Sequence, residues 1–468
     1  GIMLFVIYYL WQEVIPAKAG IQNKKTWIPS YEGMTKKISV ILFLVIVVPI
    51  FLFKTGENKI DKFLTFSTPP TSHYPLVTNP SLNITESFDI RKIVWQGAWD
   101  LSKKYPLFGT GVETFAFSYN FVRPIAHNLT SEWDYVYNKA HNEYLNYLAT
   151  TGFVGLGAYI LMMIFVISYS IKNYKKPLIS LLTISYITIL ITNFFGFSTT
   201  TIQLFFYLIP ALIFVSPDNI NIQTPKNLSI LQKFLIFLLT ASTIYLLFSI
   251  VVYYMADVNY SYGLKYSKIN DQQKAAQYFE KALKLRYEPV YEDKFSASLA
   301  YLSVIASIQK QKELTKQIVS LASSYNLKTV QTYPKNVFYW KTRAKNMYYF
   351  YQVTGNRDEL LQGVSALNTA RKLYPTDPKI PYTLSLYYST LFDISKDIIK
   401  DKEYFKILSI EEIDKTIVLK SNYREAYLFK GQLLKKYGEN PEAKKLFEYM
   451  LKNFGNNDAE VINEIKNL

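Results

Sequence analysis

The stretch Asn138–Phe165, NKAHNEYLNYLATTGFVGLGAYILMMIF, passes from a polar segment into a sequence suited to lipid. The apolar run that begins at Phe153 continues to Ile171, which is long enough to cross a bilayer as a helix, since a span takes about 20 residues. His141, one of only three histidines in the chain, therefore lies just outside a predicted membrane helix. Its position directs the search for a functional site to that end of the helix.

The composition divides the 468 residues into an apolar and a polar half. Long apolar runs fill the first 255 residues, and a Lys/Glu-rich remainder follows. The formal net charge of +16 is typical of a membrane protein with basic cytoplasmic loops and contacts to anionic lipid or phosphate. No basic motif is interleaved with aromatic residues as in single-strand binders, so no nucleic-acid partner is expected. The absence of cysteine excludes disulfides, thiolate metal sites and a cysteine nucleophile.

Four further apolar runs accompany Phe153–Ile171. They are Ile38–Phe53, Leu178–Phe197, Thr200–Val215 and Ile230–Met255. The first and third are short for a span and would need flanking residues to cross the hydrocarbon. The alternative for any one run is a buried core helix, but five such runs in one half favour a polytopic helical membrane domain over residues 38–255.

Lysines in the short loops set the orientation of these spans. Lys36 and Lys37 precede Ile38–Phe53, and three lysines within residues 172–176 separate Phe153–Ile171 from Leu178–Phe197. Because basic loops stay in the cytoplasm, Lys54–Gly152 and everything after Met255 are predicted to be extracytoplasmic.

The extreme N-terminus, residues 1–37, differs in character from the rest. Its segment Val14–Thr35, VIPAKAGIQNKKTWIPSYEGMT, lacks the apolar stretch and cleavage site of a signal peptide. It resembles the translation of a dispersed bacterial repeat element, which suggests that an upstream membrane region was lost or replaced. The alternative is an unusual cytoplasmic loop.

The polar half, residues 256–468, carries a helical repeat pattern. Ala256–Pro289 spans 34 residues, and its AAQYFEKALKL segment looks like the second helix of a tetratricopeptide repeat. Weaker copies follow at Phe338–Pro378 and Tyr423–Asn457. Such helix pairs stack into an α-solenoid because one pair cannot bury its apolar face alone. The many tyrosines are interpreted as core, and the module as a docking or spacing element for an unidentified protein partner.

The predicted extracytoplasmic segment, 54–152, is the longest polar stretch between membrane runs. Its Pro/Ser/Thr-rich start, which holds His73, is interpreted as a solvated loop. A helix is expected after Ser87 and is ended by Pro106, with Arg91 and Trp95 four residues apart on one face.

Two further features lie between that helix and the next span. In PLFGTGVETFAF, Gly109 and Gly111 indicate a tight turn, and this GxG does not follow a strand as a dinucleotide fingerprint would. A second helix is expected over about Ser131–Thr151, with His141 on one face beside three hydrophobic residues. Gly152 and Gly155 would then let the chain turn closely into the span.

These two blocks carry a resemblance. RKIVWQGAWDLSKKYPLFGTGVETF followed by HNEYLNYLATTGFVGLGAY resembles the signature region of the O-antigen ligase and polymerase superfamily of bacterial membrane glycosyltransferases. The pattern is an Arg, a Trp four residues on, PLxGxG, and later HNxxLxxLxxxGxxG leading into a membrane helix. The matching residues are Arg91, Trp95, Pro106, Leu107, Gly109, Gly111, His141, Asn142, Leu145, Leu148, Gly152 and Gly155.

The resemblance implies transfer of a glycan from an undecaprenyl-diphosphate carrier to an acceptor at the outer face of the cytoplasmic membrane, the acceptor being a lipid, a glycan or a protein. Arg91 would bind the diphosphate, since a guanidinium meets phosphate oxygens bidentately and stays charged. His141 would take the proton of the acceptor hydroxyl, because a histidine titrates near neutral pH. The expected substrate-binding residues are Trp95, Asn142, Gly109, Gly111 and Arg123.

Two further predictions concern this segment. His127, followed by Asn128, imitates the HN pair but lacks its continuation and ranks second to His141. Four acidic residues of the segment show no metal-ligand spacing: Asp100, Glu113, Glu132 and Asp134. Neither a metal nor a cofactor is therefore expected.

Other interpretations stay open. His141 could be a packing residue, and Arg91 could extend its charged end to the lipid interface. Members of the superfamily usually carry about twice as many spans, so the donor site of this chain could be incomplete. The second functional class is therefore a non-catalytic, truncated membrane-anchored repeat scaffold. A transporter is disfavoured because the spans lack intramembrane ionisable residues.

Overall fold

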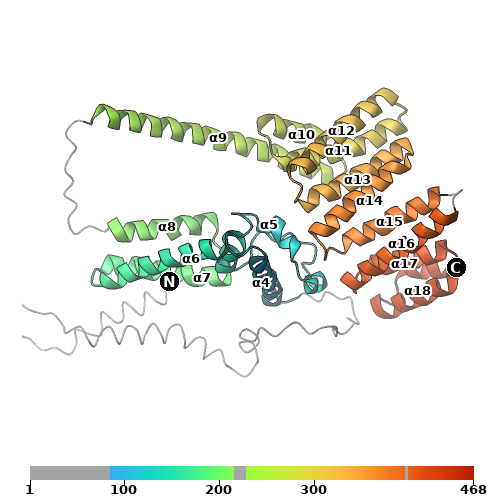
Figure 1. Ribbon diagram of the computed structural model, residues 1–468, viewed down its shortest axis with the longest axis horizontal. Helices are drawn as coiled ribbons and strands as arrows, with labels where there is room; N and C mark the ends of the chain where they lie inside the picture. Colours follow the sequence, from blue (N-terminus) through green and yellow to red (C-terminus); the bar gives the residue numbers. More distant parts are fainter. Residues whose placement is uncertain (1–84, 216–227, 396–398) are drawn as a thin grey trace, which may run out of the picture. The chain divides into compact units, whose positions relative to one another are not determined.

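The computed structural model describes residues 85–215, 228–395 and 399–468, and every regular element in these ranges is a helix (Figure 1). This confirms the all-α fold class. All of these residues fall within one of the two units into which the chain divides. The apolar run Ile38–Phe53, the atypical residues 1–37 and His73 lie outside the described residues. The domain boundaries stay predictions.

The loop segment, Thr85–Asn142, is built around one long helix. Its elements are α4 (Ser87–Lys104), α5 (Phe115–Ser118), η2 (Tyr119–Phe121) and η3 (Ile125–Leu129). Apolar residues recur three to four positions apart along α4 at Ile90, Val94, Ala98 and Leu101, and all are buried against a core that includes Phe115. The expected helix after Ser87 is therefore present, and its apolar stripe forms the centre of the segment.

Four apolar helices follow the loop segment: α6 (Glu143–Lys172), α7 (Pro177–Phe195), α8 (Thr200–Val215) and α9 (Ile230–Lys268). Of these, α6, α7 and α9 are long and apolar enough to cross a membrane, and α8 is shorter. In Figure 1, α9 continues without a break into the first repeat. The length and composition of these helices support a membrane protein.

The helix expected from Ser131 begins only at Glu143, so its predicted N-terminal half is wrong. Residues 131–142 form turns and loop instead. Asn142 caps α6 by accepting the backbone N–H of Leu145 at 3.0 Å. His141 has a φ of 55°, a left-handed conformation that cannot continue a helix. His141 therefore precedes the helix and does not lie on its face.

Gly109 and Gly111, which were predicted to form a tight turn, lie in a loop that is hydrogen-bonded to an interruption in α6. At Gly152 (φ 67°, ψ −169°) the helix changes direction. The N–H groups of Phe153 and Val154 donate to the carbonyls of Pro106 (2.8 Å) and Leu107 (3.2 Å), not to Ala149 and Thr150 one turn earlier.

The carbonyls released in this way also find partners in the loop. The Ala149 oxygen accepts the Thr110 N–H at 3.2 Å, and the Thr150 oxygen accepts the Gly111 N–H at 2.8 Å. A Cβ on Gly152 would lie 2.3 Å from the Leu107 oxygen, and one on Gly109 would lie 2.3 Å from the Thr150 carbonyl carbon. Two glycines are thus required because two backbones meet with no room for side chains.

The polar half forms antiparallel helix pairs that begin with the end of α9. The remaining helices are α10 (Gln272–Leu285), α11 (Pro289–Ile308), α12 (Lys312–Thr332), α13 (Val337–Thr354), α14 (Arg357–Leu373), α15 (Lys379–Ile394), α16 (Ile399–Leu419), α17 (Arg424–Lys436), α18 (Asn440–Phe454) and α19 (Ala459–Lys466). In Figure 1, α10 to α18 stack as successive neighbours, and α19 packs against α18.

One packing motif recurs within these pairs. Phe279 of α10 lies against Gly263 of α9, and Phe447 of α18 lies against Gly431 of α17, so the spacing from glycine to phenylalanine is the same in both pairs. In each pair a fully buried alanine precedes the phenylalanine by one turn, at Ala275 and Ala443. The repeated contact gives the predicted tetratricopeptide-like solenoid its structural basis.

The loop segment is attached to the repeats through Asn128. Its side-chain amide donates to the carbonyls of Thr376 (2.7 Å) and Leu419 (3.0 Å), which follow α14 and end α16. Its own carbonyl accepts from the ammonium of Lys420 at 2.7 Å. Asn128 and Lys420 are both buried. The solenoid is therefore joined to the loop segment by buried hydrogen bonds as well as by the chain itself.

Substitution of Gly152 tests the interrupted helix. Gly152→Ala should lower the melting temperature in detergent, because this conformation is almost restricted to glycine, costs about 1–3 kcal/mol and leaves no space for a methyl group. Gly157→Ala is the matched control in the same helix, where a Cβ meets nothing within 4 Å. We expect the control to match or slightly exceed the wild type. Equal melting temperatures for the two variants would contradict the described backbone contact.

Candidate functional site

The short turn between α7 and α8, residues 196–199, is the meeting point of the candidate site. Three contacts from other elements reach this turn or the helix end before it: the Phe195 carbonyl accepts from Arg91, the Phe197 ring contacts His141, and the Ser198 N–H donates to Glu143. Arg91 comes from α4, whereas His141 and Glu143 flank the start of α6. The turn thus brings together residues from three segments of the chain.

The side chain of Arg91, which belongs to α4, reaches the C-terminal end of α7. Its Nη1 donates to the Phe195 carbonyl at 2.8 Å. The last carbonyls of a helix have no partner within it and carry partial negative charge, so a guanidinium is favoured there. A guanidinium has five N–H donors, and this bond uses one of them. This bond therefore anchors Arg91 at the end of α7 through one of its donors.

His141 lies between two aromatic rings. Its ring centroid is 5.6 Å from that of Tyr137 and 5.1 Å from that of Phe197, both in edge-on arrangements. Burial lowers the pKa of His141 below its ordinary value, and the positive charge of Arg91 lowers it further, against a smaller opposite effect of Glu132. The imidazole is therefore neutral at neutral pH, and the effect of Arg91 reflects their proximity.

Tyr137 separates His141 from the second candidate, His127. The Tyr137 ring is 4.9 Å from that of His127, and its hydroxyl donates to the Glu132 carboxylate. His127 is completely buried, and its Nδ1 lies 3.0 Å from the Tyr119 hydroxyl. Burial, followed by the charge of Arg123, lowers the pKa of His127 to about 3. His127 is thus a neutral core residue of the loop segment.

Arg123 belongs to the same core and to the contact with the repeats. Its side chain is only 5% exposed and donates to the Trp133 carbonyl. The guanidinium carbon lies 5.5 Å from the centre of the Tyr374 ring, which follows α14. The Arg123 carbonyl accepts from Thr376 at 2.9 Å. Arg123 therefore connects the loop segment with the solenoid and does not reach the turn that holds Arg91.

The other expected substrate-binding residues have structural contacts. Trp95 is nine-tenths buried, with Phe88 and Phe194 each 6.1 Å away, so it packs α4 against the end of α7. Asn142 is buried and caps α6. Gly109 and Gly111 belong to the backbone contact at Gly152. These residues shape the site around Arg91 and His141.

Sequence reasoning missed two residues of this site. Glu143 is 4% exposed and accepts the Ser198 N–H at 3.1 Å, which connects the start of α6 to the turn. Its place directly after the His-Asn pair was a signal that could have drawn attention to it. Phe197 was assigned to the end of a span, and no pattern in the sequence indicates its contact with His141.

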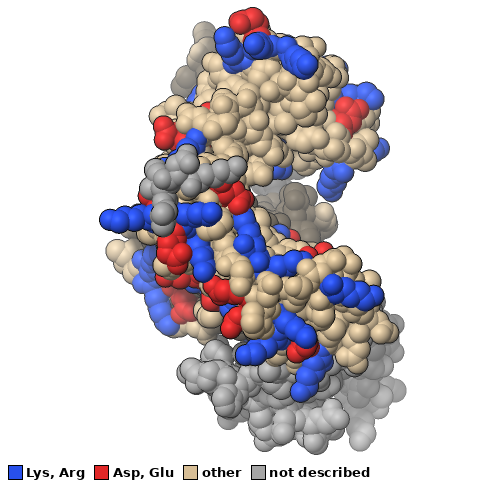
Figure 2. Space-filling view, turned by 90° about the vertical axis from the view of Figure 1, so that its right-hand side faces the viewer, with Lys and Arg blue, Asp and Glu red and all other residues tan. Residues whose placement is uncertain are grey.

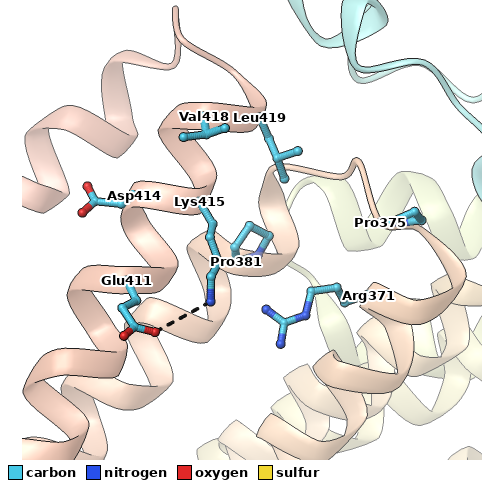
Figure 3. Close-up of a pocket in the computed structure, with 8 residues that line it drawn as sticks. All are labelled: Arg371, Pro375, Pro381, Glu411, Asp414, Lys415, Val418 and Leu419. Carbon is cyan, nitrogen blue, oxygen red and sulfur yellow. Dashed lines mark ion pairs between the residues drawn. The ribbon is translucent and has the colours of Figure 1, made fainter.

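A groove of about 470 Å³ lies elsewhere, among the repeats (Figure 3). Its lining includes Arg371 and Lys415. Both are paired with Glu412: Arg371 binds its two oxygens at 2.8 and 2.9 Å, and Lys415 binds one at 2.8 Å. Acidic and basic residues are also intermixed on the face that Figure 2 shows. The groove therefore presents mutually neutralised charges and shares no residue with the site around His141.

Comparison with known proteins gives a family match for the N-terminal third. Residues 1–160 match the model of a family described as O-Antigen ligase. This range contains Arg91, the PLFGTG loop, His141 and the start of α6. No curated protein matches the chain.

Solved structures match the repeats at low identity. A thermophilic TPR protein of Thermus thermophilus, TTC0263, is 15% identical, with 45% of this chain and 97% of that chain covered and a TM-score of 0.33. The MamA protein is 18% identical, with 42% and 91% covered and a TM-score of 0.28. The repeat architecture stands on the helix packing described above and not on these scores.

Substitutions of Glu143 test the link between α6 and the turn. Glu143→Ala leaves the Ser198 N–H without its acceptor, which typically costs about 1–3 kcal/mol when the group is buried. We expect faster hydrogen exchange over residues 196–199 in detergent, measured by mass spectrometry. Glu143→Gln keeps an amide oxygen and should exchange like the wild type. Exchange that is unchanged in the alanine variant would show that the turn does not depend on Glu143.

Acidification tests the burial of His127. Its pKa is lower in the folded than in the unfolded protein, so the unfolded chain binds more protons between about pH 3 and 6.5, and stability is lost as pH falls through that window. His127→Asn offers Tyr119 an amide oxygen and does not titrate. The melting temperature of the wild type should therefore fall more steeply from pH 7 to pH 4 than that of the variant. Parallel pH curves would contradict a neutral, buried His127.

Proposed function

We propose that this chain, whose residues 1–160 match the O-antigen ligase family, transfers a glycan from an undecaprenyl-diphosphate carrier to an acceptor hydroxyl at the membrane surface. The observation that carries the proposal is the convergence of Arg91 and His141 on the turn after α7. One is a fixed cation and the other a neutral base, and both lie beside helices suited to lipid.

In the proposed reaction, the acceptor oxygen attacks the anomeric carbon of the donor sugar. The bond from that carbon to the diphosphate oxygen breaks, and the lipid diphosphate leaves with the electron pair. The Arg91 guanidinium stabilises the charge that develops on the diphosphate. A ring nitrogen of His141 takes the hydroxyl proton and later releases it to water.

The lowered pKa of His141 suits this role. A base must be unprotonated to accept a proton, and burial together with the charge of Arg91 keeps the imidazole neutral at neutral pH. The same arrangement places a cation for the leaving group beside the base. One electrostatic arrangement thereby serves both halves of the reaction.

We place the site on the extracytoplasmic side of the bacterial cytoplasmic membrane. The lysines at 172–176 connect α6 to α7 and favour the cytoplasmic side, so the opposite end of α6, next to His141, faces outward. A lipid-linked donor would then reach the site by diffusion within the membrane.

The second candidate function is a membrane-anchored repeat scaffold without catalysis. It is favoured by the extent of the solenoid, α10–α19, and by its buried attachment to the loop segment through Asn128. On this proposal the repeats recruit a protein partner, and the residues around His141 only maintain the fold.

Glycan transfer in membranes that lack the native enzyme separates the two functions. His141→Ala should lower transfer by about 10²–10⁴-fold at matched expression, the usual contribution of a general base. Arg91→Lys should also lower it, because an ammonium keeps the charge without the planar fork. In the wild type, transfer should be constant around neutral pH and fall as acid protonates His141.

His127→Asn is the matched control, since His127 is buried outside the site. It should retain transfer if its melting temperature at neutral pH resembles that of the wild type. Loss of transfer in this variant with full activity in His141→Ala would mean that the wrong histidine was chosen. No transfer by a folded wild-type chain would favour the scaffold.

A further inference from the structure

Exposed apolar side chains gather where the PLFGTG loop meets α6. They are Leu107 (63% exposed), Phe108 (72%), Val112 (73%), Phe153 (52%) and Val154 (52%), and we call them the apolar lip. The backbone bonds from Phe153 to Pro106 and from Val154 to Leu107 hold the two halves of the lip side by side. Soluble monomeric proteins rarely expose such a cluster of apolar side chains unless it binds a partner.

The lip lies at one end of a membrane-length helix. From Phe153 the apolar part of α6 runs to Ile171 and is followed by Lys172. At 1.5 Å per residue this part is about 28 Å long, close to the roughly 30 Å thickness of a hydrocarbon core. If the lysine end lies at one face of the bilayer, Phe153 lies at the boundary between hydrocarbon and headgroups on the other.

The surface of α6 beyond the lip is also exposed and apolar. Leu161, Ile164 and Phe165 are more than half exposed and continue the surface that starts with Phe153 and Val154. The lip is therefore continuous with a surface whose expected partner is lipid. Its other half, from Leu107 to Val112, extends that surface sideways from the helix.

Basic residues precede the lip in the sequence. Lys103 and Lys104 end α4, immediately before Tyr105 and Pro106, and both lysines are exposed. Lipid phosphates lie at the headgroup level, where lysine and tyrosine are commonly found beside a membrane protein. The order from cation to aromatic to apolar residue along the chain matches the order from headgroup to hydrocarbon in a leaflet.

We propose that the Pro106–Val112 loop is inserted into the outer leaflet, with Leu107, Phe108 and Val112 in contact with lipid acyl chains. The partner is the bilayer itself, because the lip continues the lipid-facing surface of α6. The insertion fixes the depth of α6 and of His141 just before it. This inference requires that α6 spans the membrane and does not depend on glycan transfer.

The absence of cysteine in the chain makes the test direct, since one introduced cysteine is the only labelling site. Phe108→Cys carries the dye NBD, and the full chain is placed in phosphatidylcholine/phosphatidylglycerol vesicles with or without acyl-brominated lipid. We expect a blue-shifted emission that brominated lipid quenches, as it also quenches a label at Ile164→Cys deeper in the span. A label at Val136→Cys, an exposed site of the loop segment, should be quenched by aqueous iodide instead.

Two outcomes would overturn the proposal. Quenching of the Phe108→Cys label by iodide, as at Val136, would place the lip in water. A blue-shifted label that neither quencher reaches would mean that protein covers the lip. If Phe108→Cys does not fold, as judged by its melting temperature, Val112→Cys carries the same test with the same expected results.

Discussion

The exchange of backbone hydrogen bonds at Gly152 is the interaction on which the rest of the site depends. Two bonds that a continuous α6 would make within itself are replaced by four bonds to the loop 106–111. The eight backbone groups involved in this exchange are all paired, so the helix can change direction at the start of its apolar part at little cost in unpaired groups. The loop gains a rigid support and in turn fixes the end of α4. Arg91 on α4 and His141 before α6 are thus held by one connection.

This connection also explains why two motifs that lie far apart in the sequence belong together. The PLFGTG block supplies donors and acceptors that fit the interruption, and the block after His141 supplies Gly152, where a side chain would collide with Leu107. Each block thus supplies hydrogen-bonding groups or space that the other requires. The turn after α7 then completes the arrangement from a third direction, through Phe195, Phe197 and Ser198.

Features governed by local pattern were predictable from the sequence. The apolar period of α4, the run that became α8 and the first repeat pair all follow from spacing of hydrophobic residues, and the positive φ at Gly109 follows from its turn. Features governed by tertiary contact were not. The loop before Glu143 looked helical because its residues tolerate a helix, but Asn142 caps the helix and His141 adopts a left-handed conformation. Arg123 looked available for phosphate, whereas folding buries it against Tyr374.

The attachment of Asn128 to the ends of α14 and α16 has a thermodynamic consequence. Its amide bridges two successive repeat units, and Lys420 donates to its backbone carbonyl, so separation of the loop segment from the solenoid would break all three hydrogen bonds. The two regions therefore share part of their free energy of folding. A ligand that binds only the folded solenoid with this attachment in place therefore also stabilises the loop segment against unfolding. The solenoid is in this sense energetically linked to the loop segment that precedes α6 and is more than a tethered module.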